Sequence, residues 1–333
     1  SEDTFQFSMS FHHAILDGWS LANLITELYI LYNSHLSHQD SLIQLPPAIA
    51  YRDFVALERA AVNSQEHKSY WLHKLSDSTF SKLPRWPASY RLDNNQPRLI
   101  KEVPLTREVS DRLRQLAQSA GVPLKSVLLA AHLRVMSLLS GQSDVVTGLV
   151  TNGRPEEMDG ERALGLFLNT LPFRLKLSGG NWVDLVKSTF EAEQELLAFR
   201  RYPMAQIQKD LNGQPLFETA FNFTHFHVYQ NLLDANNVEL LAHTGYAITN
   251  FTFSADFAVD LLSSQVRLTL EGDGSELCNQ QMDDISGYYA RTLTAMGVES
   301  SRIYELQHLL SISEWHQLVV EWNDTENEYP LDK

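Results

Sequence analysis

Apolar and polar residues alternate at the start of the chain and then change to a helical period. Positions 5, 7, 9 and 11 hold Phe, Phe, Met and Phe with polar residues between them. This period of two predicts a half-buried strand over residues 5–11. After Gly18, apolar residues recur at Leu21, Leu24, Ile25, Leu28 and Leu31. That spacing predicts an amphipathic helix that runs to about Asn33.

The following part of the chain contains two predicted helices and then a connection. Helical patterns cover residues 50–66 and 68–75, after a polar loop over residues 35–47 that closes with two prolines. Residues 76–97 hold three prolines among Ser, Asp and Asn, without a hydrophobic period. Such a composition is typical of a connection, so residues 76–97 should separate two parts of the molecule.

Strands and helices are mixed over the rest of the chain. Strands are predicted over residues 99–103, 145–151, 167–177, 217–228, 240–242, 246–257 and 265–271. Helices are predicted over residues 182–200 and 277–296, from the capping residue Thr106 to Gly121, and after Pro123. Because strands mix with helices and the last part is rich in strands, we expect an α/β or α+β sandwich.

Composition restricts the partners and the chemistry. The 333 residues include 41 acidic and 26 basic side chains, a formal net charge of −15. Nucleic-acid binding relies on clustered Lys and Arg, so a nucleic-acid partner is not expected. Cys278 is the only cysteine, which excludes an internal disulfide and a cysteine-based metal site. The sequence shows no long apolar run and no basic signal-peptide region. We therefore expect a cytoplasmic protein without a membrane partner.

Two adjacent histidines stand where the predicted strand ends. On an extended chain His12 and His13 point to opposite sides, so one can face a cavity while the other is held in the protein. Asp17 follows His13 by four residues, and Gly18 permits a bend before the predicted helix. A histidine, a carboxylate and a helix N-terminus together make a candidate acid/base site.

With these residues the chain resembles a known family. Residues 12–18 read HHAILDG and match the HHxxxDG signature of condensation domains in non-ribosomal peptide synthetases, within the chloramphenicol-acetyltransferase-like acyltransferases. Further family segments follow in the right order: YRDF at 51–54, TNGRP at 151–155, LGLFLNTLPFR at 164–174 and YP at 202–203. The tail WNDTENEYP at 322–330 is similar to the linker into an adenylation domain. The resemblance extends over essentially the whole chain.

The resemblance implies a fold of two chloramphenicol-acetyltransferase-like lobes in a V, with the substrate tunnel between them. Residues 1–97 would be the C-terminal part of the first lobe, residues 98–310 the second lobe, and residues 311–333 the linker toward a downstream adenylation domain. In the family the histidine signature lies well inside the first lobe, whereas here it begins at residue 12. We therefore expect an incomplete first lobe and poor activity of this chain alone.

The resemblance also implies a reaction and its partners. An upstream carrier protein presents an acyl or peptidyl thioester on its phosphopantetheine arm, and a downstream carrier protein presents an aminoacyl acceptor whose amine forms the amide. The thioester is already activated, so no covalent nucleophile is needed, and neither a metal nor a redox cofactor is expected. The sequence accordingly contains no Gly-x-Ser-x-Gly elbow, phosphate-binding glycine loop or dinucleotide fingerprint.

The family's residue roles can be carried over one by one. His13 is the catalytic residue, either as a base or by positioning the amine, and His12 is a supporting residue oriented inward. Asp17 has a structural role and pairs with Arg154, and the backbone around Gly18 supplies oxyanion donors. Asn169 either satisfies a buried backbone group or lines the tunnel, and Trp19 is also assigned to the tunnel. Arg200 and Arg201 end a predicted helix, where cations suit the helix dipole.

Other functions stay open at this point. A free-standing acyltransferase that uses coenzyme A fits the histidine signature but not the adenylation-type tail. A non-catalytic recruiting module has no need of an intact signature, and epimerase or heterocyclisation relatives match residues 17–20 poorly. His225 and His227 share one strand face, but without a third ligand nearby a packed or tunnel-lining face is favoured over a metal site.

Overall fold

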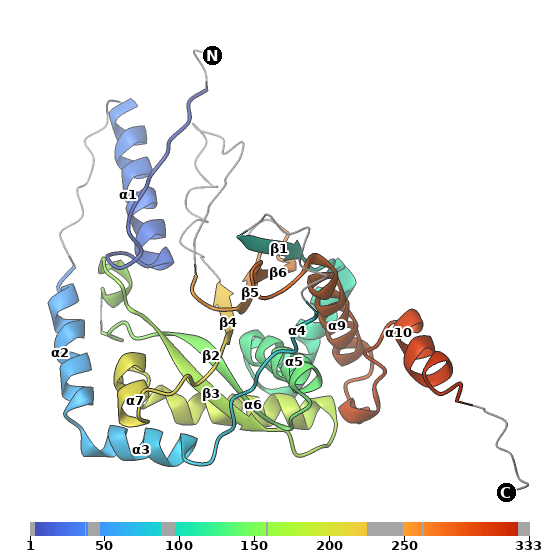
Figure 1. The fold of residues 1–333 in the computed structure, drawn as a ribbon. Coiled ribbons are helices and arrows are strands. Elements are labelled where there is room, and N and C mark those ends of the chain that lie inside the picture. The colour runs from blue at the N-terminus through green and yellow to red at the C-terminus, as the bar shows by residue number, and fades with distance from the viewer. Residues whose placement is uncertain are drawn as a thin grey trace, which may run out of the picture.

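The described part of the chain is organised around one sheet. The computed structural model describes residues 4–36, 38, 47–87, 97–157, 159–224, 249–260 and 263–325. Their sheet has six strands in the order β1-β6-β5-β4-β2-β3 (Figure 1). The strands are β1 (Arg98–Glu102), β2 (Asp144–Asn152), β3 (Leu168–Lys176), β4 (Thr219–Thr224), β5 (Phe253–Val259) and β6 (Val266–Asp273). The mixed α/β fold expected from the sequence is confirmed.

The sheet combines parallel and antiparallel pairs. β4 runs parallel to both of its neighbours, β2 and β5, whereas the other adjacent strands are antiparallel. β2 and β3 pair over their full length, from Asp144 opposite Lys176 to Asn152 opposite Leu168. This long pair carries the TNGRP turn at the end of β2 and the Asn-Thr-Leu-Pro segment of β3, so it presents two of the family segments side by side.

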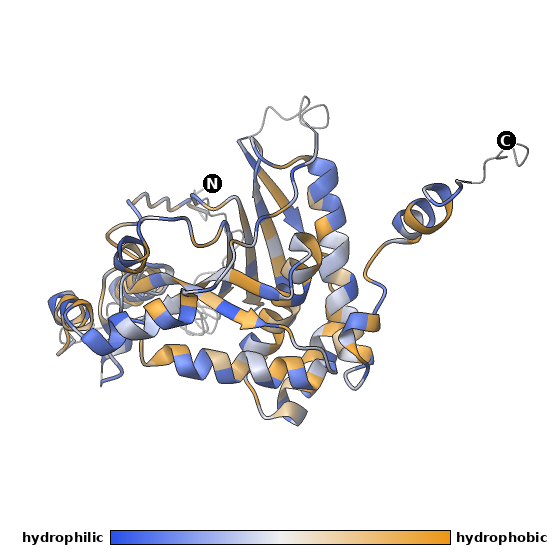
Figure 2. Cartoon of the chain, turned by 60° about the horizontal axis from the view of Figure 1, so that its bottom comes forward, coloured by the Kyte–Doolittle hydropathy of each residue, from blue (hydrophilic) through white to orange (hydrophobic). Residues whose placement is uncertain are grey.

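Helices cover one face of the sheet and bury the main core. They are α4 (Arg107–Ala120), α5 (Leu124–Ser140), α6 (Trp182–Leu197) and α9 (Asn279–Val298). α5 packs against α4, α6, α9 and the sheet, and every residue from Ser126 to Leu133 is buried. α4 begins and ends as predicted: Thr106 accepts a hydrogen bond from the Val109 amide, and Gly121 stops the helix at a φ of 71°. In the hydropathy colouring, hydrophobic stretches are visible on the strands and on the helices that lie beside and below them (Figure 2).

A second group of helices lies beside the β2–β3 pair. It consists of α1 (Gly18–Leu36), α2 (Tyr51–Val62), α3 (Gln65–Leu75) and the short α7 (Met204–Asp210). α3 packs on α7, and α7 packs on β3. α1 contacts the turn of 3₁₀ helix η2 (Gly160–Arg162) and projects away from the sheet at its far end (Figure 1). The predicted site residues His12, His13 and Asp17 directly precede the start of α1 at Gly18.

Of two predictions for the first 36 residues, the strand is wrong and the helix is confirmed. Residues 5–11 form no strand, and Phe5 and Phe7 are 68% and 55% exposed. A period of two becomes a strand only when another strand supplies hydrogen bonds, and no strand of the described sheet lies next to these residues. The predicted helix is present as α1, and its buried residues are Ser20, Ala22 and Thr26, while the apolar positions that predicted it are partly buried or exposed. Within the described residues, α1 is held mainly by its first turns.

The remaining elements lie toward the C-terminus. The 3₁₀ helix η4 (Tyr304–Leu306) precedes α10 (Ile312–His316) and the π-helical turn η5 (Gln317–Glu321). α10 and η5 lie at the edge of the molecule in both views (Figures 1 and 2); Arg291 Nη2 on α9 lies 3.7 Å from Glu314 Oε2 on α10, and Ile312 is 90% exposed. Part of the expected linker is therefore helical. The division into lobes at residues 97 and 310 stays a prediction.

Some sequence predictions fall on residues that are not described. The strand at residues 240–242, His225 and His227, and residues 326–330 of the tail all lie outside the described ranges. Among the helices that are described, none is long and apolar enough by itself to cross a membrane. The bent pair α4 and α5, at 107°, meets the length and composition criterion only when the two are taken together.

Candidate active site

The histidine pair lies in a turn just before α1. The Ile15 amide donates to the His12 carbonyl at 3.1 Å, and the Ala14 amide donates to His12 Nδ1 at 3.1 Å. An accepting Nδ1 places the proton of the neutral ring on Nε2. Both histidines are exposed, so the expectation that His12 is oriented inward is wrong. The chain turns here instead of staying extended, and the alternation of side chains along a strand does not apply.

The ring of His13 is accessible. It lies with its centroid 6.2 Å from the ring centroid of Phe11, at an angle of 59°, and no described residue forms a hydrogen bond with it. Both ring nitrogens can therefore be offered to a substrate. This is the arrangement that a base or an amine-positioning group requires, because its hydrogen-bonding capacity is not used inside the protein.

Asp17 is fully buried and caps α1. Its Oδ1 accepts from the Ser20 amide at 2.7 Å, and its Oδ2 accepts from the Phe167 amide at 3.1 Å. The Asp17 amide in turn donates to the Gly165 carbonyl at 3.0 Å. A carboxylate at a helix N-terminus satisfies amides that have no partner within the helix. Here it also joins α1 to the segment that leads into β3.

Arg154 completes this buried group. Its Nη2 lies 2.8 Å from Asp17 Oδ1, and the two side chains are 6% and 0% exposed. Nη1 donates to the carbonyls of Gly160 at 3.2 Å and Ala163 at 2.5 Å. The guanidinium also lies 4.1 Å from the centre of the Phe167 ring. Burial lowers the pKa of Arg154, while the Asp17 charge acts in the opposite direction. The ion pair expected from the sequence is present.

Ser20 is a third member of the group that the sequence did not single out. Its hydroxyl oxygen accepts from Arg154 Nη2 at 2.6 Å and from the Gly165 amide at 3.0 Å, and the hydroxyl donates to the Gly165 carbonyl at 2.8 Å. Ser20 is 0% exposed. The hydroxyl thus uses both its donor and its acceptor capacity, and it connects the first turn of α1 with two other chain segments.

An aromatic cluster packs the YRDF segment against Phe167, next to the buried group of Asp17, Arg154 and Ser20. The rings of Tyr51, Phe54 and Phe167 have centroids 5.1–5.7 Å apart. Two glycines allow the cluster to form. A Cβ on Gly165 would lie 2.2 Å from Tyr51 Cδ2, and one on Gly153 would lie 2.8 Å from Phe54 Cε2. Segments 12–20, 51–54 and 151–155 and the first residues, 164–167, of the fourth family segment therefore meet at the start of α1.

Asn169 and Trp19, which were assigned to a tunnel, both have backbone partners. Asn169 Nδ2 donates to the carbonyls of Arg200 at 3.2 Å and Tyr202 at 2.9 Å, and Oδ1 accepts from the Met204 amide at 3.3 Å. Of the two roles considered for Asn169, it has the backbone-satisfying one. The indole of Trp19 donates to the Glu161 carbonyl at 3.0 Å, which fixes α1 against η2.

The start of α1 also defines which amides a substrate oxygen can reach. The Ser20 amide donates to the Asp17 side chain and the Leu21 amide to the Asp17 carbonyl. The Gly18 amide forms no hydrogen bond with any described residue. Amides at a helix N-terminus favour negative charge, so Gly18 stays a reasonable oxyanion donor. Its role is a prediction.

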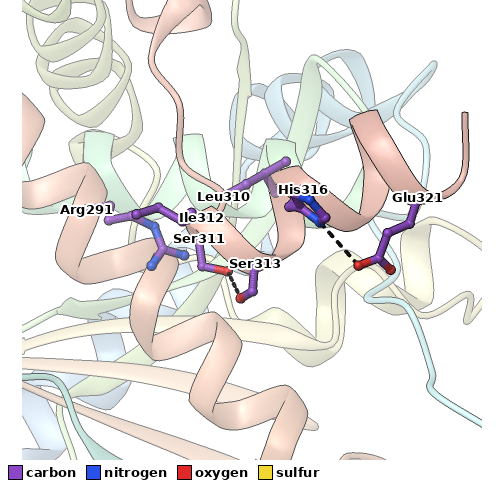
Figure 3. Close-up of a pocket in the computed structure, with 7 residues that line it drawn as sticks. All are labelled: Arg291, Leu310, Ser311, Ile312, Ser313, His316 and Glu321. Atoms are coloured by element: carbon purple, nitrogen blue, oxygen red, sulfur yellow. Dashed lines mark hydrogen bonds and ion pairs between the residues drawn. The ribbon is translucent and has the colours of Figure 1, made fainter.

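A cavity of about 760 Å³ lies elsewhere, at the C-terminal end of the described chain. Its lining residues are Arg291, Leu310, Ser311, Ile312, Ser313, His316 and Glu321 (Figure 3). His316 Nδ1 and Glu321 Oε1 are 3.2 Å apart. None of the predicted site residues borders this cavity, and α10 lies across the molecule from α1 (Figure 1). Over the described ranges, no three His, Cys, Asp or Glu side chains form a group that could hold a metal ion.

Comparisons with known proteins agree with this geometry. The family model of the condensation domain matches residues 1–292. The AMB antimetabolite synthetase AmbE of Pseudomonas aeruginosa is 39% identical over 228 residues, which are 68% of this chain and 10% of the synthetase. The chain spans a tenth or less of the length of the first curated relatives that it matches.

Two solved structures share the fold. The first condensation domain of the CDA synthetase superimposes with a TM-score of 0.72 at 17% identity, over 90% of this chain and 66% of that one. The X-domain from teicoplanin biosynthesis, solved as a complex with OxyB, gives a TM-score of 0.70 at 16% identity, over 90% and 69%. With the family model matching residues 1–292, and residues of all four signature segments gathered around Asp17, the chain belongs to the condensation-domain family.

Proposed function

We propose that this chain forms an amide bond between two carrier-bound substrates. The donor is an acyl or peptidyl thioester on the phosphopantetheine arm of one carrier protein, and the acceptor is an aminoacyl thioester on a second carrier protein. The observation that carries the proposal is the accessible imidazole of His13, to which no described residue forms a hydrogen bond, four residues before Asp17 of the buried Asp17–Arg154 pair. Membership of the condensation-domain family supports it.

The reaction needs few groups from the protein. The neutral amine of the acceptor attacks the thioester carbonyl, the carbon–sulfur bond breaks, and the freed thiol takes up the proton that the amine loses. His13 accepts this proton or a hydrogen bond from the amine, since a neutral imidazole can do so near pH 7. The Gly18 amide at the start of α1 stabilises the oxyanion. Positioning alone supplies a large part of such an acceleration.

Asp17 acts by holding the turn. Both of its carboxylate oxygens already accept hydrogen bonds from Ser20, Phe167 or Arg154, and it is completely buried. A carboxylate in this state is not available to take a proton from the substrate. Its contribution is the fixed geometry of residues 12–18, as expected from the sequence.

A recruiting function is the second candidate. It is supported by the shared fold with the X-domain that was solved in complex with OxyB. At 16% identity that likeness concerns the fold alone. The accessible His13 favours the catalytic function, because a docking surface has no use for an imidazole placed at a helix N-terminus.

The test is a reconstituted condensation. A carrier loaded with a donor thioester and a second carrier loaded with an aminoacyl group are mixed with the chain, and the amide is detected by mass spectrometry. A parallel reaction offers the donor as a coenzyme A thioester, which tests the free-standing acyltransferase. Amide from the carrier-bound donor that His13→Ala abolishes is the expected result. The same reaction is run with a version of the chain extended toward the N-terminus, because poor activity is expected of this chain alone. No amide above background from either protein with either donor would refute the catalytic proposal.

A downstream adenylation domain and a cytoplasmic location also belong to the proposal, and both rest on sequence features.

A further inference from the structure

Two arginines that follow α6 reach back to the turn that carries Arg154. Arg200 Nε donates to the Asn152 carbonyl at 3.0 Å. Arg201 Nε donates to the Gly153 carbonyl at 3.2 Å, and its Nη2 donates to the Arg154 carbonyl at 3.4 Å. Three consecutive carbonyls of the turn therefore accept from two consecutive arginines, although 48 residues separate the segments.

The helix-end role expected for these arginines fits only one of them. Arg200 Nη1 donates to the Leu197 carbonyl at 2.8 Å, at the end of α6, and its Nη2 pairs with Glu156. Both hydrogen bonds of Arg201 go to the turn instead. A guanidinium can donate to two carbonyls at once, which a lysine ammonium does less rigidly. The contacts of Arg201 are thus specific to the position of the turn.

The segment that bears these arginines is itself fixed to the β2–β3 pair. Asn169 binds the carbonyls of Arg200 and Tyr202 and accepts from the Met204 amide. Asn169 lies directly opposite Thr151 in the sheet, and the Thr151 hydroxyl donates to the Asn169 carbonyl at 2.8 Å. The anchor of the arginines and the start of the turn are therefore neighbours on two paired strands.

We propose that Arg201 is a positioning residue for the condensation reaction, acting by fixing the Gly153–Arg154 turn. The turn places the Arg154 guanidinium against Asp17 Oδ1 and Ser20 Oγ, and these two residues fix the first turn of α1. His13 stands four residues before Asp17, so a shift of the turn moves the imidazole relative to the bound amine. The expected effect of Arg201 on the reaction rate rests on the proposed function. Its expected effect on the position of the turn rests on the contacts alone.

The test compares Arg201→Met with a matched control. Arg98→Met also removes a guanidinium that donates to a backbone carbonyl, that of Phe251 at 2.9 Å, and its second nitrogen donates to the Thr249 hydroxyl at 2.9 Å. Arg98 lies on β1, at the opposite edge of the sheet from β3, and neither of these partners belongs to the turn. Arg201→Lys is the conservative variant, which keeps the charge and one donor group. Each variant of the full chain is measured for Tm, for kcat and KM of the condensation, and for deuterium uptake by peptides covering residues 12–20 and 151–156.

We expect Arg201→Met to lower kcat by about 10- to 100-fold, since a displacement of about 1 Å at a reacting group can have an effect of that size. KM for the acceptor should stay unchanged, deuterium uptake should rise in both peptides, and Arg201→Lys should recover part of kcat. Arg98→Met should lower Tm without changing kcat or the deuterium uptake of either peptide. Wild-type uptake by residues 12–20 in Arg201→Met would overturn the inference, as would an equal kcat loss in Arg98→Met. If neither the wild-type chain nor its extended version makes amide, the proposed function fails, and the deuterium uptake still decides the positional link.

Discussion

Breaking the Asp17–Arg154 pair from either side should destabilise the protein strongly, and the two losses should not add. Removing one partner of a buried ion pair typically costs about 3–5 kcal/mol. Asp17→Asn has a specific difficulty, because both carboxylate oxygens accept from N–H groups. The amide nitrogen of an asparagine would have to face either the Phe167 amide or the Ser20 amide and Arg154. At least one donor would then meet another donor.

Arg154→Gln should destabilise for a different reason. Asp17 would keep the amides of Ser20 and Phe167, but the carbonyls of Gly160 and Ala163 would lose the guanidinium that binds them. Because Asp17 and Arg154 contact each other directly, the double variant should lose less than the sum of the single losses. The coupling energy expected for residues in one such network is about 0.5–3 kcal/mol.

The assay is urea unfolding at pH 7, followed by circular dichroism, for the wild type, both single variants and the double variant. The exposed pair Glu108–Arg112 on α4, with nitrogen and oxygen 2.7 Å apart, is the control. Its cycle should show a coupling below about 0.5 kcal/mol, because solvent screens exposed helix pairs. Strictly additive losses for Asp17 and Arg154 would refute the view that the two side chains act as one buried unit.

Three further predictions concern single residues. His13→Ala should lower amide formation by about 10²–10⁴-fold with an unchanged Tm, because the ring is exposed; near-full activity would contradict its assignment. Complete burial lowers the pKa of His132 to about 3, below the unfolded value of about 6.5. The unfolded state therefore binds a proton first, so the contribution of His132 to the free energy of unfolding should be level above about pH 6.5. This contribution should fall by up to about 1.4 kcal/mol per pH unit toward pH 3. Urea titrations at several pH values check this: an equal dependence of the free energy of unfolding on pH in the wild type and in His132→Gln would contradict it. Gly165→Ala should cost about 1–3 kcal/mol by crowding the Tyr51 ring, and an unchanged urea midpoint would show that the ring moves aside freely.

Local signals were sufficient for several elements after residue 98. Thr106 and Gly121 delimit α4 because an N-cap hydroxyl and a left-handed glycine act within a few residues of themselves. The apolar run after Pro123 became the buried helix α5, which also ends at a left-handed glycine, Gly141, although Pro123 supplies no capping hydrogen bond. The signature at residues 12–18 and the TNGRP turn also allowed the Asp17–Arg154 pair to be predicted, although 137 residues separate the two. Resemblance to a family supplied that long-range link.

What only the tertiary structure decided was which groups find partners far along the chain. The alternation at residues 5–11 specifies a strand only if another strand pairs with it, and α1 buries its predicted face only if something covers it. His12 turned outward because a local turn uses its Nδ1. Arg201 and Ser20 carry no sequence signal of their own, since their importance comes from carbonyls and amides brought near by the β2–β3 pair. Periodicity and caps act over a few residues, whereas these contacts exist only after the sheet has formed.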